Sequence, residues 1–79
     1  MKGGLYNTSE VASYLGVDAE DVVRMAREDG LPVITLPGKK RPIRRFSALA
    51  LYHWMVGRSA GTPIGLEAFL GDLAAVRRE

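Results

Sequence analysis

The chain has 79 residues, of which 47% are hydrophobic and 25% are charged, and it contains no cysteine. This length allows one small domain, and the absence of cysteine excludes disulfides and thiolate metal sites. No apolar run approaches the roughly 20 residues that a membrane-spanning helix needs, and the first residues lack the apolar core of a signal peptide. We therefore expect a soluble, cytoplasmic domain.

The net charge of +2 conceals an uneven distribution along the chain. Residues 1–30 carry three basic and six acidic side chains, whereas residues 31–46 carry five basic side chains and no acidic one. Residues 47–79 carry three of each. An anionic partner would therefore meet the middle segment first. The five cations of that segment are Lys39, Lys40, Arg41, Arg44 and Arg45.

Two short helices are predicted near the N-terminus, after a flexible segment over residues 1–5. Asn7 and Glu10 have the spacing of a capping box, so the first helix starts at Asn7. Gly16 can take the left-handed conformation that ends it. The second helix covers residues 18–28, with Asp18 as its N-cap. Its apolar positions recur at helical spacing and are Ala19, Val22, Val23 and Ala26.

Residues 33–46 are predicted to form a β-hairpin. Residues 33–36 are rich in strand-forming side chains, and residues 36–39 suit a type II turn with a glycine at the position of positive φ. Residues 42–46 form the return strand. Its first residue, Pro42, cannot donate a backbone hydrogen bond, so the start of this strand must lie on a sheet edge. Hydrophobic and basic residues alternate imperfectly along residues 42–46, so we expect a bulge in this strand or an early end of it.

A third helix is predicted over residues 48–56, capped by Ser47 and ended by Gly57. Its apolar residues are expected to supply much of the core, and they include Leu49, Leu51, Tyr52, Trp54, Met55 and Val56. After a linker over residues 58–63, Thr62 is the predicted N-cap of a fourth helix. One face of this helix is apolar, formed by Leu66, Phe69, Leu70, Leu73 and Val76. This face either folds back on the domain or pairs with another chain, as a homodimer or with a partner protein through residues 63–78.

The predicted order is helix, tight turn, helix, basic hairpin, helix, which is the order of a winged helix-turn-helix. The segments "TSEVASYLGV", "VVRMAREDGLP" and "IRRFSALALYHW" together resemble the excisionase-type helix-turn-helix DNA-binding domain of the MerR-like winged-helix superfamily. The resemblance implies an α+β fold with a winged helix-turn-helix domain over residues 6–57 and a C-terminal helical extension over residues 58–79. Members of this group are bacterial or phage-encoded, and the chain is expected to be nucleoid-associated.

The resemblance implies sequence-specific binding of double-stranded DNA, as a small transcriptional regulator or an excisionase-like recombination-directionality factor. In a helix-turn-helix, the second helix enters the major groove, and a basic wing can contact the backbone. The candidates for reading bases are Asp18, Glu20, Asp21 and Arg24, of which Arg24 matches the family position that contacts DNA. The candidates for contacting the DNA backbone are Arg27, Lys39, Lys40, Arg41, Arg44 and Arg45.

Two interpretations of the acids at the start of the second helix stay open. In the first, Asp18 caps the helix while Glu20 and Asp21 stabilise its dipole. In the second, Glu20 or Asp21 accepts a hydrogen bond from the N4 amino group of a cytosine. Acids that face phosphates would repel them, so an alternative function is a protein-interaction adaptor. A subunit of a phage packaging complex, similar to a small terminase, would be such an adaptor.

The basic residues also have a structural interpretation. The hairpin cations could form a merely solvated turn, and Arg24 and Arg27 could be surface ion-pair partners of Glu20 and Glu28. His53 stands alone, without the residues of a metal or catalytic cluster. We therefore expect no enzymatic activity, no metal and no cofactor, and we assign the large aromatic side chains to the core.

Overall fold

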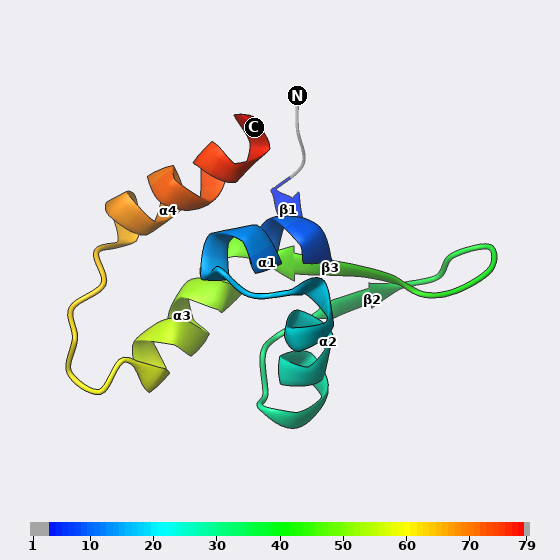
Figure 1. The fold of residues 1–79 in the computed structure, drawn as a ribbon, viewed down its shortest axis with the longest axis horizontal. Helices are drawn as coiled ribbons and strands as arrows, with labels where there is room; N and C mark the ends of the chain where they lie inside the picture. The colour runs from blue at the N-terminus through cyan, green and yellow to red at the C-terminus, as the bar shows by residue number, and fades with distance from the viewer. Residues whose placement is uncertain (1–3, 79) are drawn as a thin grey trace.

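Two helices, a long hairpin and two further helices follow one another along the chain (Figure 1). The structure is a computed structural model that describes residues 4–78, and over these residues four α-helices and a three-stranded antiparallel sheet form a small α+β domain. The elements are β1 (Leu5–Tyr6), α1 (Thr8–Leu15), α2 (Ala19–Glu28), β2 (Ile34–Leu36), β3 (Ile43–Ser47), α3 (Ala48–Arg58), α4 (Leu66–Ala75) and a 3-10 turn, η1 (Val76–Arg78). Within the described residues, no helix is long and apolar enough to cross a bilayer.

The start of the chain is held by hydrogen bonds that the sequence predicted. The Asn7 side chain accepts a hydrogen bond from the Glu10 backbone at 2.8 Å, and the Glu10 carboxylate accepts one from the Asn7 backbone at 2.9 Å. This capping box begins α1, and Gly16 ends it with a φ of 75°. Both predicted ends of the first helix are therefore confirmed, because each depends on a local interaction.

The sheet has the order β1-β3-β2, so β3 is its central strand. Strand β1 was not predicted: residues 1–3 of the segment expected to be flexible lie outside the described residues, but Leu5 pairs with Ser47. The expected bulge or early end of the return strand is wrong, because the pairing with β2 runs regularly from Leu36 opposite Ile43 to Ile34 opposite Arg45, and β3 continues to Ser47. Strand β1 pairs with the last two residues of β3, so the sheet extends to the residue before α3.

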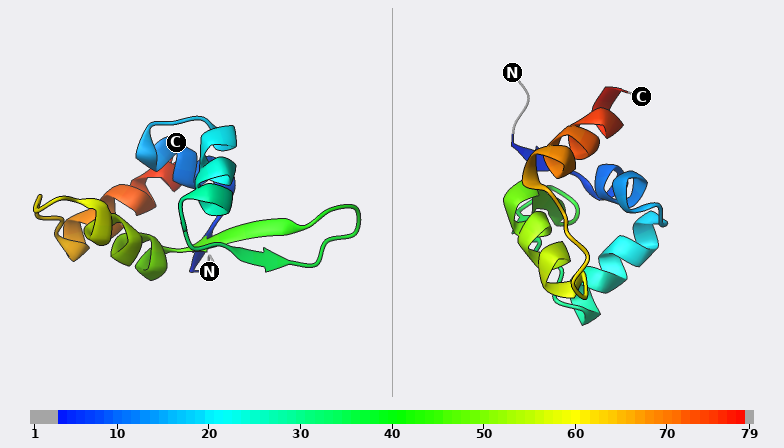
Figure 2. Two further views of the ribbon diagram at one scale, coloured as in Figure 1. Left: turned by 90° about the horizontal axis from the view of Figure 1, so that it is seen from below. Right: turned by 90° about the vertical axis from the view of Figure 1, so that its left-hand side faces the viewer.

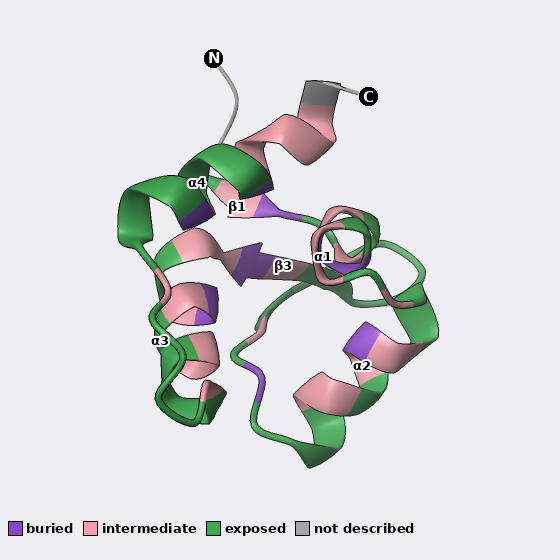
Figure 3. Cartoon of the chain, turned by 60° about the vertical axis from the view of Figure 1, so that its left-hand side comes forward, coloured by how far each residue is buried: buried purple, intermediate pink, exposed green. Residues whose placement is uncertain are grey.

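The core draws a buried side chain from nearly every element (Figure 3). Its buried residues are Tyr6, Val11, Ala12, Val22, Leu31, Phe46, Leu51, Phe69 and Leu73. Trp54 and Tyr52 pack against this core as predicted, and the Trp54 indole donates a hydrogen bond to the Asp29 carbonyl at 3.0 Å. The prediction was wrong for Leu49 and Val56, which are 55% and 42% exposed. Both lie on the exposed side of α3.

The connection between α3 and α4 differs from the predicted one. Helix α3 continues through Gly57 to Arg58, and α4 begins at Leu66 after an N-cap at Gly65, not at Thr62. The Tyr52 hydroxyl donates a hydrogen bond to the Ile64 carbonyl at 2.7 Å. This contact joins residues twelve positions apart, which a local capping signal cannot reveal.

Helix α4 folds back on the domain. Phe69 is 2% exposed and meets the Tyr14 ring edge-on at a centroid distance of 5.3 Å, with the Tyr52 ring at 5.4 Å. Leu73 is fully buried. Residues 58–78 therefore complete the core of the preceding segment. Leu66 and Leu70 of the same predicted apolar face remain about two-fifths exposed, and a second chain against them stays a prediction.

Arg77, in η1, connects the C-terminal helices to β1 and α1. Its guanidinium donates to the Glu10 carboxylate at 2.9 Å and to the Leu5 carbonyl, and it lies over the Tyr6 ring at 3.8 Å from the centroid. The Arg77 and Glu10 side chains are only 23% and 22% exposed. Because water screens a partly buried pair less than an exposed one, this contact should contribute measurably to stability.

We expect Glu10→Gln to make stability less dependent on pH. Burial opposes ionisation of Glu10, but the hydrogen bonds from the Asn7 backbone and Arg77 outweigh it and hold the pKa of this carboxyl below its ordinary value. A lowered pKa gives stability that is present above the unfolded-state pKa and is lost as the pH falls through the folded-state pKa. The variant should be about 1 kcal/mol less stable near pH 7, and this difference should be smaller near pH 3.

Urea unfolding at both pH values measures this difference, and the exposed Glu67 on α4 offers a matched Glu→Gln control. An equal loss at both pH values would show that the Glu10 charge contributes nothing to the contact with Arg77.

Candidate nucleic-acid interface

The β2–β3 hairpin projects beyond the helices and carries the densest positive charge of the chain (Figure 2). A six-residue loop, residues 37–42, joins its strands. Lys39, Lys40 and Arg41, here called the hairpin tip, are all exposed. Long cationic side chains at such a tip can approach an anionic polymer without removing any core residue from its place.

The loop at the tip does not form the predicted type II turn. Gly38 lacks the positive φ that this turn requires, whereas Gly16, Gly30 and Gly61 have it. Glycine is needed at position 38 for another reason: an added Cβ would collide with the Arg41 carbonyl oxygen. The backbone of Arg41 therefore lies directly against Gly38, and the three cations of the tip are exposed on this tight loop.

Alternation along β3 sends its two arginines to opposite faces of the sheet. Arg44 shares a face with the buried Phe46, and it is exposed beside α2. Arg45 is half-buried on the other face and donates a hydrogen bond to the Arg44 carbonyl at 2.8 Å. Its charge also helps to lower the pKa of Glu10. Of the five hairpin cations, Arg45 is therefore the least available to a partner.

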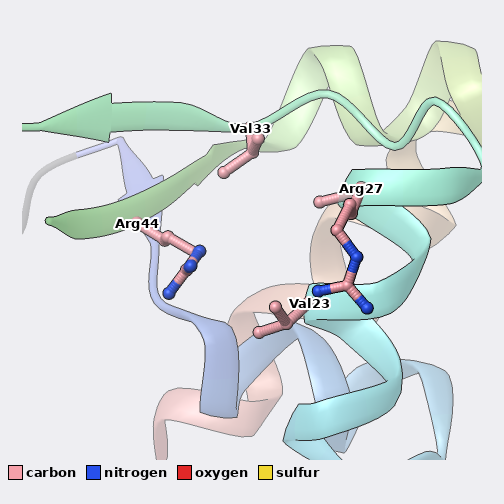
Figure 4. A pocket seen from close by; sticks show the side chains of 5 residues that line it. Val23, Arg27, Val33 and Arg44 are labelled. Atoms are coloured by element: carbon pink, nitrogen blue, oxygen red, sulfur yellow. The ribbon is translucent and has the colours of Figure 1, made fainter.

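Helix α2 and the base of the hairpin enclose a small cleft (Figure 4). Val23 and Arg27 reach it from α2, and Val33 and Arg44 reach it from the hairpin, around a volume of about 150 Å³. Two predicted backbone candidates from separate segments, Arg27 and Arg44, thus lie on opposite sides of one opening. The apolar valines lie between them.

A second hollow adjoins this cleft along α2. Ala19, Glu20, Val23 and Arg27 line it, around a volume of about 390 Å³. Because Val23 and Arg27 line both hollows, the two form one surface, which we call the α2–hairpin cleft. Three of its residues, Ala19, Val23 and Arg27, are spaced four apart and so follow one side of the helix. The exposed side of α2 and the basic hairpin are therefore neighbours.

The remaining candidates on α2 form a small ion-pair cluster outside the cleft. Arg24 donates a hydrogen bond to the Asp21 carboxylate at 2.9 Å and lies 3.9 Å from the Asp29 carboxylate. The Asp21 carboxylate also accepts a hydrogen bond from the backbone of Asp18, the N-cap residue, at 3.3 Å. The hydrogen bond from Arg24, followed by that from Asp18, lowers the pKa of Asp21. Asp21 is therefore engaged within the protein.

The predicted pair between Glu20 and Arg24 is wrong, because Arg24 turns to Asp21, three residues before it, and to Asp29 beyond the end of the helix. Arg24 itself remains 46% exposed. The predicted pair of Arg27 with Glu28 is confirmed, at 3.5 Å between exposed groups. The place of Arg27 in the cleft was not foreseen, although its four-residue spacing from Val23 was visible in the sequence.

Among the described residues, no group of three or more His, Cys, Asp or Glu side chains has an arrangement that could hold a metal ion. His53 is exposed on α3, where its ring meets the edge of Tyr52. Comparisons with protein families, curated proteins and solved structures found no match to this chain. The arrangement of side chains at the cleft and the hairpin tip is thus the basis for assigning a function.

Proposed function

We propose that this chain is a winged helix-turn-helix domain that binds double-stranded DNA in a sequence-specific manner, with α2 in the major groove and the hairpin as a wing on the backbone. One observation carries the proposal: the exposed side of α2 and the basic hairpin line a single cleft, with Arg27 and Arg44 on its two sides. One duplex can therefore contact both elements together. Such a domain would serve as a small transcriptional regulator or as an excisionase-like recombination-directionality factor.

The dimensions of the helix pair support this arrangement. Helix α1 packs against α2 across a connection of three residues, Gly16 to Asp18, and α1 is itself fixed in the core by Val11 and Ala12. Because α1 supports only one side of α2, the opposite side of α2 is open to solvent. An α-helix has a diameter of about 10–12 Å with its side chains, and the major groove of B-DNA is about 12 Å wide. Helix α2 therefore fits the groove while the hairpin reaches the neighbouring phosphates.

The distribution of charge supports attraction to phosphates despite the acids on α2. The hairpin tip and Arg44 contribute four exposed cations, and Arg27 adds a fifth from α2. Two of the acids, Asp21 and Asp29, lie close to Arg24 and are partly neutralised by it. If four or five cations neutralise phosphates, the logarithm of the binding constant should fall against the logarithm of salt concentration with a slope of about −4 to −5.

A salt titration of binding to a random-sequence duplex tests the proposal. Fluorescence anisotropy of a labelled duplex, measured from about 50 to about 200 mM salt, gives the slope directly. Binding with the slope above supports DNA as the partner. No binding at the lowest salt concentration would instead favour an interaction adaptor.

We expect Arg24→Ala to reduce sequence preference more than overall affinity. Arg24 is exposed, and a base edge could replace the carboxylate of Asp21 as the partner of its guanidinium. Loss of one such contact should cost about 1–3 kcal/mol on a duplex selected from a random pool, and much less on random duplex. Arg58→Ala, at the far end of α3, is the control. Equal losses on both duplexes would remove Arg24 from the base-reading set.

A second candidate function, a protein-interaction adaptor such as a packaging-complex subunit, is favoured by a different surface. Leu66 and Leu70 of α4 are 40% and 41% exposed, and they lie one helical turn apart. A homodimer or a partner protein could cover them. Light scattering of the free chain, and of the chain with DNA, would separate self-association through α4 from binding as a single copy.

A further inference from the structure

The side of α2 that lines the α2–hairpin cleft is mostly apolar at its start. Ala19 is exposed there, Val23 is half-buried, and Glu20 and Arg27 flank them. Neither Ala19 nor Val23 has a side-chain atom that can donate or accept a hydrogen bond. If this side faces base edges, these two residues can distinguish them only by apolar contact.

In the major groove, one feature of the base edges suits such contact. Thymine carries a methyl group at C5 beside its O4 acceptor, whereas the other unmodified bases present donors and acceptors but no methyl group. We infer that Ala19 and Val23 form an apolar seat that recognises the C5 methyl group of a pyrimidine. This inference rests on the proposed function, because it requires α2 to lie in the major groove.

The geometry of the cleft favours a small apolar group at this place. Ala19 has only a methyl side chain, so it leaves room beside the branched side chain of Val23, which stands one turn further along the helix. The hollow that both line is the larger of the two in the cleft, about 390 Å³. Arg27 and Arg44 attract the backbone of any duplex, so the apolar seat supplies discrimination and the arginines supply attraction.

Two bases can present a C5 methyl group, and Glu20 distinguishes them. Thymine has an acceptor oxygen at C4, whereas 5-methylcytosine has an N4 amino group that can donate to a carboxylate. Glu20 lies beside Ala19 at the rim of the same hollow. Tighter binding to 5-methylcytosine than to thymine, lost in Glu20→Ala, would identify the modified base, and the reverse preference would identify thymine. Either result supports the methyl-reading seat.

The test compares duplexes that differ by single methyl groups. In a duplex selected from a random pool, each thymine is replaced in turn by deoxyuridine, and each cytosine by 5-methylcytosine. These exchanges leave the phosphate charge unchanged, so the backbone contribution cancels in the ratio of dissociation constants. At the position read by α2, the methyl group should strengthen binding about fourfold, as expected for burial of one methyl-sized group.

Val23→Ala should abolish this methyl dependence, measured as the ratio of dissociation constants for duplexes with and without the methyl group, in which a general loss of affinity cancels. Val56→Ala is the matched control, because Val56 is 42% exposed on α3 and does not line the cleft. Circular dichroism and urea unfolding establish that both variants are folded. Ala19→Ser provides a second test at an exposed position that folding does not need.

Three outcomes would overturn the inference: no methyl dependence at any position, methyl dependence that survives both Val23→Ala and Ala19→Ser, or equal loss of the methyl dependence in Val56→Ala. In each of them the wild-type chain still binds duplex DNA, so each is distinct from failure of the proposed function. Absence of binding by the wild-type chain to every duplex would overturn that function, and the inference with it.

Discussion

Replacing Phe69 with alanine is expected to lower the free energy of unfolding by about 3–5 kcal/mol. The Phe69 side chain is 2% exposed, and it fills the space between the rings of Tyr14 on α1 and Tyr52 on α3. Truncation would leave a cavity that these rings can fill only by moving. Domains are stabilised by about 0.05–0.15 kcal/mol per residue, so this loss would remove a large fraction of the stability of a chain this short.

Urea or thermal unfolding followed by circular dichroism measures the effect. Leu70→Ala is the matched control, because Leu70 is the next residue of α4 and is 41% exposed. Its substitution should cost under about 1 kcal/mol. Similar small losses in both variants would mean that α4 does not pack on α1 and α3 in solution, and that residues 58–79 are dispensable for folding.

Replacing all three cations of the hairpin tip with alanine is expected to remove most of the affinity for any duplex. If each of Lys39, Lys40 and Arg41 neutralises one phosphate, the salt slope should become less steep by about 3 units. Between about 50 and 200 mM salt, wild-type affinity should then fall about 500-fold, and that of the variant only about tenfold. The three side chains are exposed, so the stability of the fold should not change.

Arg41→Lys is the charge-conserving control for this experiment, and it should keep the wild-type slope because the contact is to backbone charge. A triple variant with the wild-type slope would show that the tip does not meet phosphates. If the triple variant loses affinity only for a selected sequence, the tip instead reads bases, and the assignment of α2 to the groove would need revision.

Local signals predicted the ends of the first helix, although the type II turn predicted from residues 36–39 does not form. The capping box of Asn7 and Glu10 and the left-handed Gly16 were predicted correctly, because their hydrogen-bond partners lie within four residues. The start of α4 was predicted incorrectly: the helix begins at Leu66, and Ile64 before it accepts a hydrogen bond from Tyr52, twelve positions earlier in the chain. Strand β1 has two residues and was missed, since its partners lie about 40 residues further along the chain.

The candidate interface was predictable in composition but not in geometry. The five cations between residues 39 and 45 indicated that an anionic partner would meet the hairpin first. Alternation placed Arg44 with Phe46 on one face of the strand. The sequence could not show that Arg24 turns toward Asp21 and Asp29, since several carboxylates lie within its reach. Nor could it show that Arg27 faces Arg44, because this depends on how α2 packs against the hairpin.

The contact of Arg77 with Leu5 and Glu10 has a consequence for how the chain folds in the cell. These partners are separated by 72 and 67 positions. During synthesis, β1 and α1 leave the ribosome about 70 residues before the Arg77 guanidinium that they contact. Domains generally fold as units, so this one should fold after translation has passed Arg77 and not progressively behind the ribosome.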